Sequence, residues 1–184
     1  LLEDIREART DDRPLWDLMA AGRGYTALLI AHDLKLFALL GEQPRTLADI
    51  CVALKLAEPP AEALLTMLQA LSLVQAQNGH YALTPLAADA LVETSPTYFG
   101  WYLDREIANE AVFSFRRLKD ALVNNIPLTQ HSDRRMFIRA MHSMSMSAAL
   151  SWPKALDLAA HHLLLDIGGG SGAHSIGATL HWPH

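Results

Sequence analysis

Apolar residues recur along the first part of the chain at the three- and four-residue intervals of helices that bury one side. This pattern predicts helix over residues 1–40, which Gly22 and Gly24 weaken and which Gly41 is suited to end. Further apolar residues lie off the main stripe of this helix, so we expect neighbouring surfaces to cover it on more than one side. They are Ile30, Leu36 and Phe37.

Two shorter helices and a hairpin follow in the pattern. Thr46 stands at the capping position of "LADICVALKL", and Pro59-Pro60 suit the first turn of a helix over 61–74. Two short extended arms then flank Asn78-Gly79, the dipeptide best suited to a tight hairpin because both residues accept positive φ. Thr84-Pro85 open another short helix. The order of helix, helix and hairpin is that of a winged helix.

The second half of the pattern predicts longer helices and then a strand. After a break at Ser95-Pro96 we expect one long helix from Tyr98 to Val123, a loop "LTQHSD", and a helix over 133–149. Trp152-Pro153 precede a short predicted helix, "KALDLAA". The nearly all-apolar run "HLLLDIG" has the composition of a parallel strand buried on both faces.

The stretch "LLLDIGGGSGAHS", residues 163–175, places four glycines in five positions between this predicted strand and a predicted helix start. A strand, a glycine turn and a helix N-terminus together expose backbone N–H groups and the positive end of a helix dipole. Two ligand classes fit the spacing. Gly168, Gly170 and Ala173 satisfy G-x-G-x-x-A of dinucleotide sites, whereas Asp166 before the glycines gives the D-x-G-x-G-x-G of S-adenosylmethionine sites.

Other glycine motifs fit less well. A phosphate loop requires a Lys that the chain does not have after Gly177, and a nucleophile elbow requires Gly where Ala173 stands. No His, Cys, Asp and Glu spacing resembles a metal site.

Composition narrows the classes of partner. Hydrophobic residues make up 51% of the 184 residues and charged residues 19%, so the chain can bury a core. The net charge of −5 argues against nucleic acid or an anionic membrane as the main partner. Cys51 is the single cysteine, which excludes an internal disulfide and favours a reducing, cytoplasmic location. The start lacks the order of a signal peptide, and no apolar run approaches the ~18 residues of a membrane span.

At this point the chain resembles the small-molecule S-adenosylmethionine-dependent O-methyltransferases of the caffeic acid, hydroxyindole and bacterial antibiotic type. "LLLDIGGGSG" resembles the first cofactor motif of that family, and "FRRLKDALVNNIP" resembles its long helix and the exit from it. "FIRAMHSMS" resembles the helix that carries Phe, Met and Ser beside the cofactor and the substrate. The resemblance covers nearly the whole chain.

The resemblance implies a mainly α winged-helix dimerisation domain followed by the start of an α/β Rossmann-like methyltransferase domain. The corresponding boundaries are residues 1–95 for the N-terminal dimerisation domain, 96–160 for linking helices that line the pocket, and 161–184 for the first strand, glycine loop and helix start. It also implies a homodimer and a small, aromatic hydroxyl acceptor.

Site residues are carried over by position. The resemblance assigns cofactor binding to Asp166, Gly168, Gly169, Gly170, Gly172 and Ser145, and substrate binding to Phe137 and Met141. The family's catalytic base is a His in a motif downstream of His184, and none of the nine histidines here lies in that motif. We therefore assign no catalytic residue, expect a chain truncated after the first cofactor motif, and expect the 184 residues alone to be inactive.

Two alternatives remain on the residues alone. A winged-helix transcription regulator is compatible with the hairpin, but the candidate recognition helix 59–74 carries Glu62 and no Lys or Arg to meet phosphates. A nicotinamide-dependent oxidoreductase is compatible with the glycines. Its fingerprint, however, usually follows the first strand of a domain, and here a long, mostly helical region precedes it.

Overall fold

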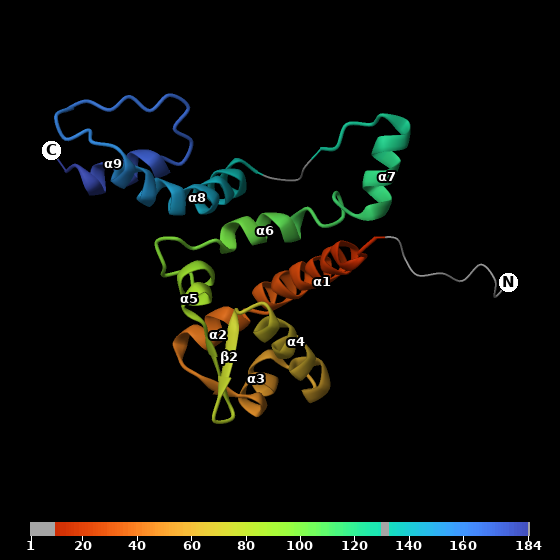
Figure 1. Ribbon diagram of the computed structural model, residues 1–184. Helices are drawn as coiled ribbons and strands as arrows, with labels where there is room; N and C mark the ends of the chain where they lie inside the picture. Colours follow the sequence, from red (N-terminus) through yellow and green to blue (C-terminus); the bar gives the residue numbers. More distant parts are fainter. Residues whose placement is uncertain (1–9, 130–132, 184) are drawn as a thin grey trace.

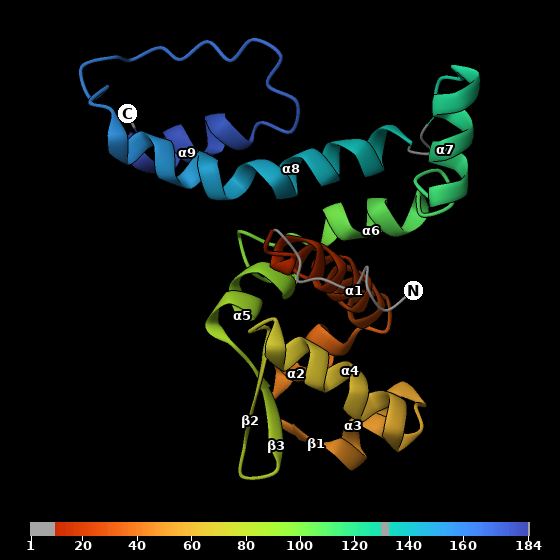
Figure 2. The same ribbon diagram turned by 45° about the vertical axis from the view of Figure 1, so that its right-hand side comes forward.

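The structure is a computed structural model that describes residues 10–129 and 133–183. Its N-terminal elements are α1 (Arg13–Asp33), α2 (Leu36–Glu42), β1 (Arg45–Thr46), α3 (Leu47–Leu54), α4 (Glu58–Ala70), β2 (Val74–Gln77), β3 (His80–Leu83) and α5 (Pro85–Leu91). The later elements are α6 (Gly100–Ala108), α7 (Phe115–Asn124), α8 (Arg134–Ser151), the 3-10 helix η1 (Trp152–Ala155) and α9 (Ala173–His181). In Figures 1 and 2, α6 lies between α1 on one side and α8 on the other, and both contacts are extensive.

Local sequence signals account for the small sheet and the helices around it. Thr46 and Asp49 form a capping box at the start of α3, each side chain accepting from the other's backbone N–H. Asn78 and Gly79 have φ of 52° and 76°, as the tight turn between β2 and β3 requires. The antiparallel order is β1-β3-β2, with Val74 opposite Leu83. The predicted helix–helix–hairpin order is therefore confirmed.

The first predicted helix is divided at a different place from the one expected. α1 continues through Gly22 and Gly24, and the chain turns instead at Lys35, which has φ of 63°. At Gly24 a Cβ would lie 3.0 Å from Leu71 Cδ2, so this glycine permits a close approach rather than a break. α2 runs past Gly41 to Glu42. The part of the prediction over residues 1–9 lies outside the described residues.

The main core joins α1 to α6 around fully enclosed side chains. Phe37, Leu65 and Leu68 are each no more than 1% exposed, and Leu103 of α6 belongs to the same cluster. Two of the three off-stripe residues, Leu36 and Phe37, are buried as predicted, whereas Ile30 is 47% exposed. The N-terminal elements thus share one core with the first helix of the second half.

The long helix predicted from Tyr98 to Val123 is wrong, because two helices occupy this stretch. α6 ends at Ala108 and α7 begins at Phe115, turned away from the line of α6 in Figure 1. Asn109 is fully buried, and its side-chain amide donates to the carbonyl of Arg105 at 2.8 Å. Ser114 then caps α7 by accepting from Arg117 N–H. Such side-chain bonds to the backbone favour a helix end over continuation.

The region between α8 and α9 differs most from expectation. The predicted strand "HLLLDIG" is not formed, and the arc above α8 and α9 in Figure 1 has neither helix nor strand from 156 to 172. Leu163 and Ile167 are 90% and 87% exposed. A strand requires a neighbour for its N–H and C=O groups, and none of the described residues supplies one beside this run.

The prediction of a short helix over "KALDLAA" is also wrong. Only the 3-10 turn η1 forms, Leu156 is extended, and Asp157 accepts from Ala159 N–H at 3.3 Å, which turns the chain out of a helical path. α8 and α9 themselves form where predicted, and Trp152 packs against Trp182 across their ends with ring centroids 5.8 Å apart. Residues 130–132 of the predicted loop "LTQHSD" lie outside the described residues.

Within residues 10–129 and 133–183, none of the helices is by itself long and apolar enough to span a membrane; α1 and α2 together, bent by 64°, meet the length and composition of a span.

Candidate cofactor site

The glycine loop is held at the N-terminus of α9 by the packing of α9 on α8. Met146 and Ala149 of α8 form a buried cluster with Ala173, the first residue of α9. One turn later, Gly177 lies directly against the backbone carbonyl of Ala149, where any Cβ would overlap it. The close approach of the two helices fixes where the loop must end.

Three glycines of the loop have backbone conformations that other residues rarely adopt. The φ angles of Gly168, Gly170 and Gly172 are 76°, 56° and 76°, and Gly172 is the N-cap of α9. Gly172 N–H donates to the carbonyl of Gly169 at 2.7 Å, which closes a tight turn. A Cβ at Gly168 or Gly172 would meet nothing within 4 Å, so an open surface adjoins the main chain at both positions.

Asp166 is anchored to the helix that follows the loop. Its Oδ2 accepts from Ser175 Oγ at 2.7 Å, and the same carboxylate lies over Gly169, where a Cβ would stand 2.7 Å from Oδ2. Gly169 therefore leaves the space that the carboxylate fills. An exposed, oriented carboxylate beside backbone N–H groups can accept from a ligand's ammonium or hydroxyl donor.

The residues assigned to the pocket share one face of α8. Phe137, Met141 and Ser145 are spaced four apart, which places them on one side of a helix. Phe137 is 47% exposed, and Met141 and Ser145 are half-buried. Among the described residues, Ser145 makes no side-chain hydrogen bond, so its contact with a cofactor stays a prediction.

Sequence reasoning missed the residue that joins α8 to the loop. His142 Nδ1 lies 3.0 Å from Ser171 Oγ, and its ring lies 5.9 Å from that of Trp101 on α6. Arg139, one turn earlier, stands 5.3 Å over the same indole. No sequence signal marks these contacts, because the glycine motif specifies no residue type at position 171, and Ser171 lies 29 residues from His142.

Partly buried polar contacts link α1 to α6, and α8 to the segment before α6. His32, 4% exposed, pairs with Asp104 of α6 at 2.8 Å. Ser143 Oγ of α8 donates to the carbonyl of Tyr98 at 2.8 Å. Burial, followed by the charges of Asp104 and Glu93, raises the pKa of the Tyr98 hydroxyl to about 12. This segment before α6 thus joins the N-terminal elements to the helix that contacts the glycine loop.

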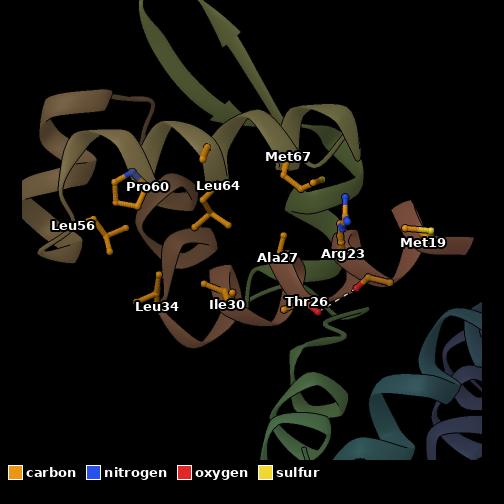
Figure 3. Close-up of a pocket in the computed structure, with 12 residues that line it drawn as sticks. Met19, Arg23, Thr26, Ala27, Ile30, Leu34, Leu56, Pro60, Leu64 and Met67 are labelled. Atoms are coloured by element: carbon orange, nitrogen blue, oxygen red, sulfur yellow. Dashed lines mark hydrogen bonds between the residues drawn. The ribbon is translucent and has the colours of Figure 1, made fainter. Parts of the chain in front are cut away.

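A separate apolar groove of about 710 Å³ runs between α1 and α4 (Figure 3), and both helices lie far from the glycine loop in Figure 1. In Figure 3, Ala27 and Ile30 of α1, with Leu34 just after it, face Leu64 and Met67 of α4. The adjoining turns of α1 expose more large apolar side chains, which are Leu15, Trp16, Leu18 and Met19 at 65%, 62%, 71% and 48%. An exposed apolar surface of this extent is typical of a protein interface.

Comparison with known proteins agrees with this arrangement. Residues 16–93 match the family model of the O-methyltransferase dimerisation domain. The chain is similar to 3-hydroxy-5-methyl-1-naphthoate 3-O-methyltransferase of Streptomyces sahachiroi, with 29% identity over 168 residues that cover 85% of this chain and 48% of the relative. It thus spans about half the length of that relative.

Solved structures share the fold. Human N-acetylserotonin methyltransferase in complex with S-adenosylmethionine has a TM-score of 0.73 at 24% identity, covering 97% of this chain and 59% of that one. The N,N-8-amino-8-demethyl-D-riboflavin dimethyltransferase of Streptomyces davawensis has a TM-score of 0.74 at 20% identity, covering 95% and 57%. The resemblance to O-methyltransferases predicted from the sequence is confirmed: residues 16–93 match the model of their dimerisation domain, and the chain is similar to an O-methyltransferase.

Proposed function

We propose that this chain is the dimerisation domain and the first part of the cofactor-binding domain of an S-adenosylmethionine-dependent O-methyltransferase. The observation that carries the proposal is the match of residues 16–93 to the dimerisation domain, followed in the same chain by the glycine loop with its three left-handed glycines. The winged-helix character of residues 1–95, the linking role of 96–160 and the Rossmann-like start at 161–184 belong to this proposal.

The loop has the features that S-adenosylmethionine requires of it. The open surface at Gly168 and Gly172 leaves room for a ligand against the main chain, where a side chain would fill the space. The N-terminus of α9 offers N–H groups and a positive dipole end to a carboxylate. Asp166, held by Ser175, offers an acceptor to an ammonium group. When bound, the cofactor would supply an electrophilic methyl group.

The apolar run before the loop supports the proposed strand. Leu163, Leu165 and Ile167 are 79–90% exposed in a segment that is nearly all apolar. Residues of this kind are usually covered. We infer that neighbouring strands of a parallel sheet cover them in the assembled cofactor domain.

An aromatic hydroxyl compound is the acceptor class we propose. The Phe137–Met141 face of α8 offers an apolar wall with an aromatic ring and a flexible thioether, which suits a flat ring. The curated relative acts, by its name, on a hydroxynaphthoate, and the human neighbour on N-acetylserotonin. The riboflavin dimethyltransferase, which by its name methylates an amino group, shows that the fold alone does not fix the acceptor. Our proposal of a hydroxyl acceptor therefore depends on the O-methyltransferase of Streptomyces sahachiroi.

The residues of this chain contribute binding and orientation rather than proton transfer. Methyl transfer requires in-line placement of the acceptor oxygen, a base for its proton and a pocket without water. α8 and the loop supply part of the placement and part of the wall. We assign the base to none of the 184 residues and expect no methyl transfer from the chain by itself.

We also propose a homodimer in the cytoplasm, formed through the apolar surface of α1 and the groove beside α4. None of the relatives described above is a transcription regulator or a nicotinamide oxidoreductase, so neither alternative is supported.

The proposal is tested by binding. The product of the complete reading frame should bind S-adenosylhomocysteine in a calorimetric titration and should not bind NADH under the same conditions. Binding of NADH in place of S-adenosylhomocysteine, or of neither, would refute the proposal. The 184-residue chain, titrated alongside, is expected to bind S-adenosylhomocysteine weakly.

A further inference from the structure

His142 stands where three parts of the molecule meet. Its Nδ1 is 3.0 Å from Ser171 Oγ in the glycine loop, and its ring is tilted by 49° against Trp101 of α6. Trp101 is itself held by the edge of Tyr98, with ring centroids 5.6 Å apart. The imidazole is half-buried, so neighbouring rings restrict its orientation while one nitrogen faces the loop.

The packing of α8 on α9 brings His142 to this place. His142, Met146 and Ala149 are spaced four and three apart, so they form one stripe along α8. Met146 and Ala149 pack on Ala173 at the start of α9. His142 therefore continues the same stripe one turn beyond the N-terminus of α9, where the facing chain is the glycine loop.

The loop needs such a contact more than most turns do. Residues 161–170 are exposed, and glycine loses more conformational freedom on ordering than any other residue. Within the loop, Gly172 N–H donates to Gly169, and Asp166 accepts from Ser175 of α9. The His142–Ser171 hydrogen bond adds a tie to a helix on the other side of the loop.

We propose that His142 is a positioning residue, which through Ser171 holds the glycine loop against α8 in the conformation that binds the cofactor. This inference rests on the proposed function for the identity of the ligand, but not for the contact itself. His142 touches neither the cofactor nor the acceptor in this account. Its effect on the reaction is to reduce the freedom of a loop that must be ordered before the ligand binds.

Three variants separate the hydrogen bond from the ring contact. His142→Phe keeps a ring against Trp101 and removes the nitrogen. His142→Asn keeps a polar atom close to the position of Nδ1 and removes most of the ring. Ser171→Ala removes the partner hydroxyl. Ser147→Ala, on the exposed side of α8, serves as the matched control, since its hydroxyl makes no hydrogen bond within the described part of the chain.

The first readout is hydrogen exchange of the ligand-free protein, measured by NMR at Gly172 and Ile176. Both amides are hydrogen-bonded at the junction of loop and helix, to Gly169 and Gly172 respectively. Loss of one hydrogen bond should raise their exchange by about three- to tenfold in His142→Phe and Ser171→Ala. His142→Asn and Ser147→Ala should remain near the parent, and the double variant His142→Phe/Ser171→Ala should exceed neither single variant.

The second readout is affinity for S-adenosylhomocysteine in the product of the complete reading frame. The same two single variants should weaken binding by about three- to tenfold, raise KM for the cofactor by a similar factor and leave kcat at saturating cofactor near the parental value. Unchanged exchange in His142→Phe and Ser171→Ala, or additive effects in the double variant, would overturn the inference. If the parent binds no S-adenosylhomocysteine, the proposed function fails, while the exchange measurement still decides whether His142 holds the loop.

Discussion

Gly168 and Gly79 form a pair that tests the role of the glycine loop against an internal standard. Both have φ of 76°, and at both a Cβ would meet nothing within 4 Å. An alanine at either position therefore carries the same backbone strain and creates no clash. Gly79 closes the hairpin of β2 and β3, far from the loop in Figure 1, so only Gly168→Ala alters the candidate cofactor site.

The cost of the left-handed conformation for a residue with a Cβ is about 1–2 kcal/mol. In the exposed loop, a local shift of the backbone can relieve this strain. The strain therefore lowers the fraction of molecules whose loop has the ligand-binding conformation, rather than the stability of the fold. An energy of that size corresponds to about 5- to 30-fold weaker binding of S-adenosylhomocysteine by Gly168→Ala. Gly168→Val should lose more, since a β-branched side chain resists this region further.

The assay is calorimetric titration of the complete reading-frame product together with a thermal melt of each variant. Gly79→Ala should keep the parental affinity and lower Tm, by about 2–4 °C per kcal/mol of strain. Gly168→Ala should keep a Tm near the parental value and lose affinity. Parental affinity in Gly168→Ala, or an equal loss of affinity in both variants, would refute the assignment of this turn to the cofactor.

Four further predictions concern the rest of the molecule. Sedimentation at micromolar concentration should show a dimer, for which we expect an interface above ~2,000 Å². Ala63→Glu in the groove between α1 and α4 should shift the equilibrium toward monomer, and a parent protein that sediments only as monomer would contradict the prediction. DNA binding measured by fluorescence anisotropy at ~0.15 M salt should be weak and salt-sensitive, and a nanomolar complex with a defined site would overturn this expectation. Thr46→Ala should lower the free energy of unfolding by about 1 kcal/mol through loss of the capping box, measured by urea denaturation, with Ser147→Ala unchanged. The pKa of the Tyr98 hydroxyl is raised from 10.0 to about 12, so its contribution to stability is fully present below pH 10.0 and is lost as the pH rises toward 12. Tyr98→Phe should therefore flatten the dependence of the free energy of unfolding on pH between 10.0 and about 12, and an unchanged slope would contradict the assignment.

The features predicted correctly from sequence depend on residues close together in the chain. Thr46 with Asp49, and Asn78 with Gly79, act over four residues or fewer, so the sequence pattern is sufficient to locate the cap and the turn. The division between α6 and α7 depends on the burial of Asn109, a tertiary effect that helical periodicity does not contain.

The candidate site was predictable in part for the same reason. The glycine motif is local, and its left-handed glycines could be expected from spacing. The contact of His142 with Ser171 depends on how α8 packs on α9, and the sequence carries no sign of it. The predicted strand before the loop failed for another reason. The composition of Leu163 and its neighbours is that of a strand, but a strand forms only when a second strand pairs with it.

The contact of Gly177 with the Ala149 carbonyl bears on how this protein can change over time. The separation of α8 and α9 is set there by main-chain atoms, so at this point it does not depend on the side chains at exposed positions of the two helices. Exposed positions such as Ile176 and Leu180 are therefore free to vary without displacing the end of the glycine loop. Position 177 itself is closed to every residue larger than glycine, so we expect homologous chains that differ widely along α9 to keep this one residue.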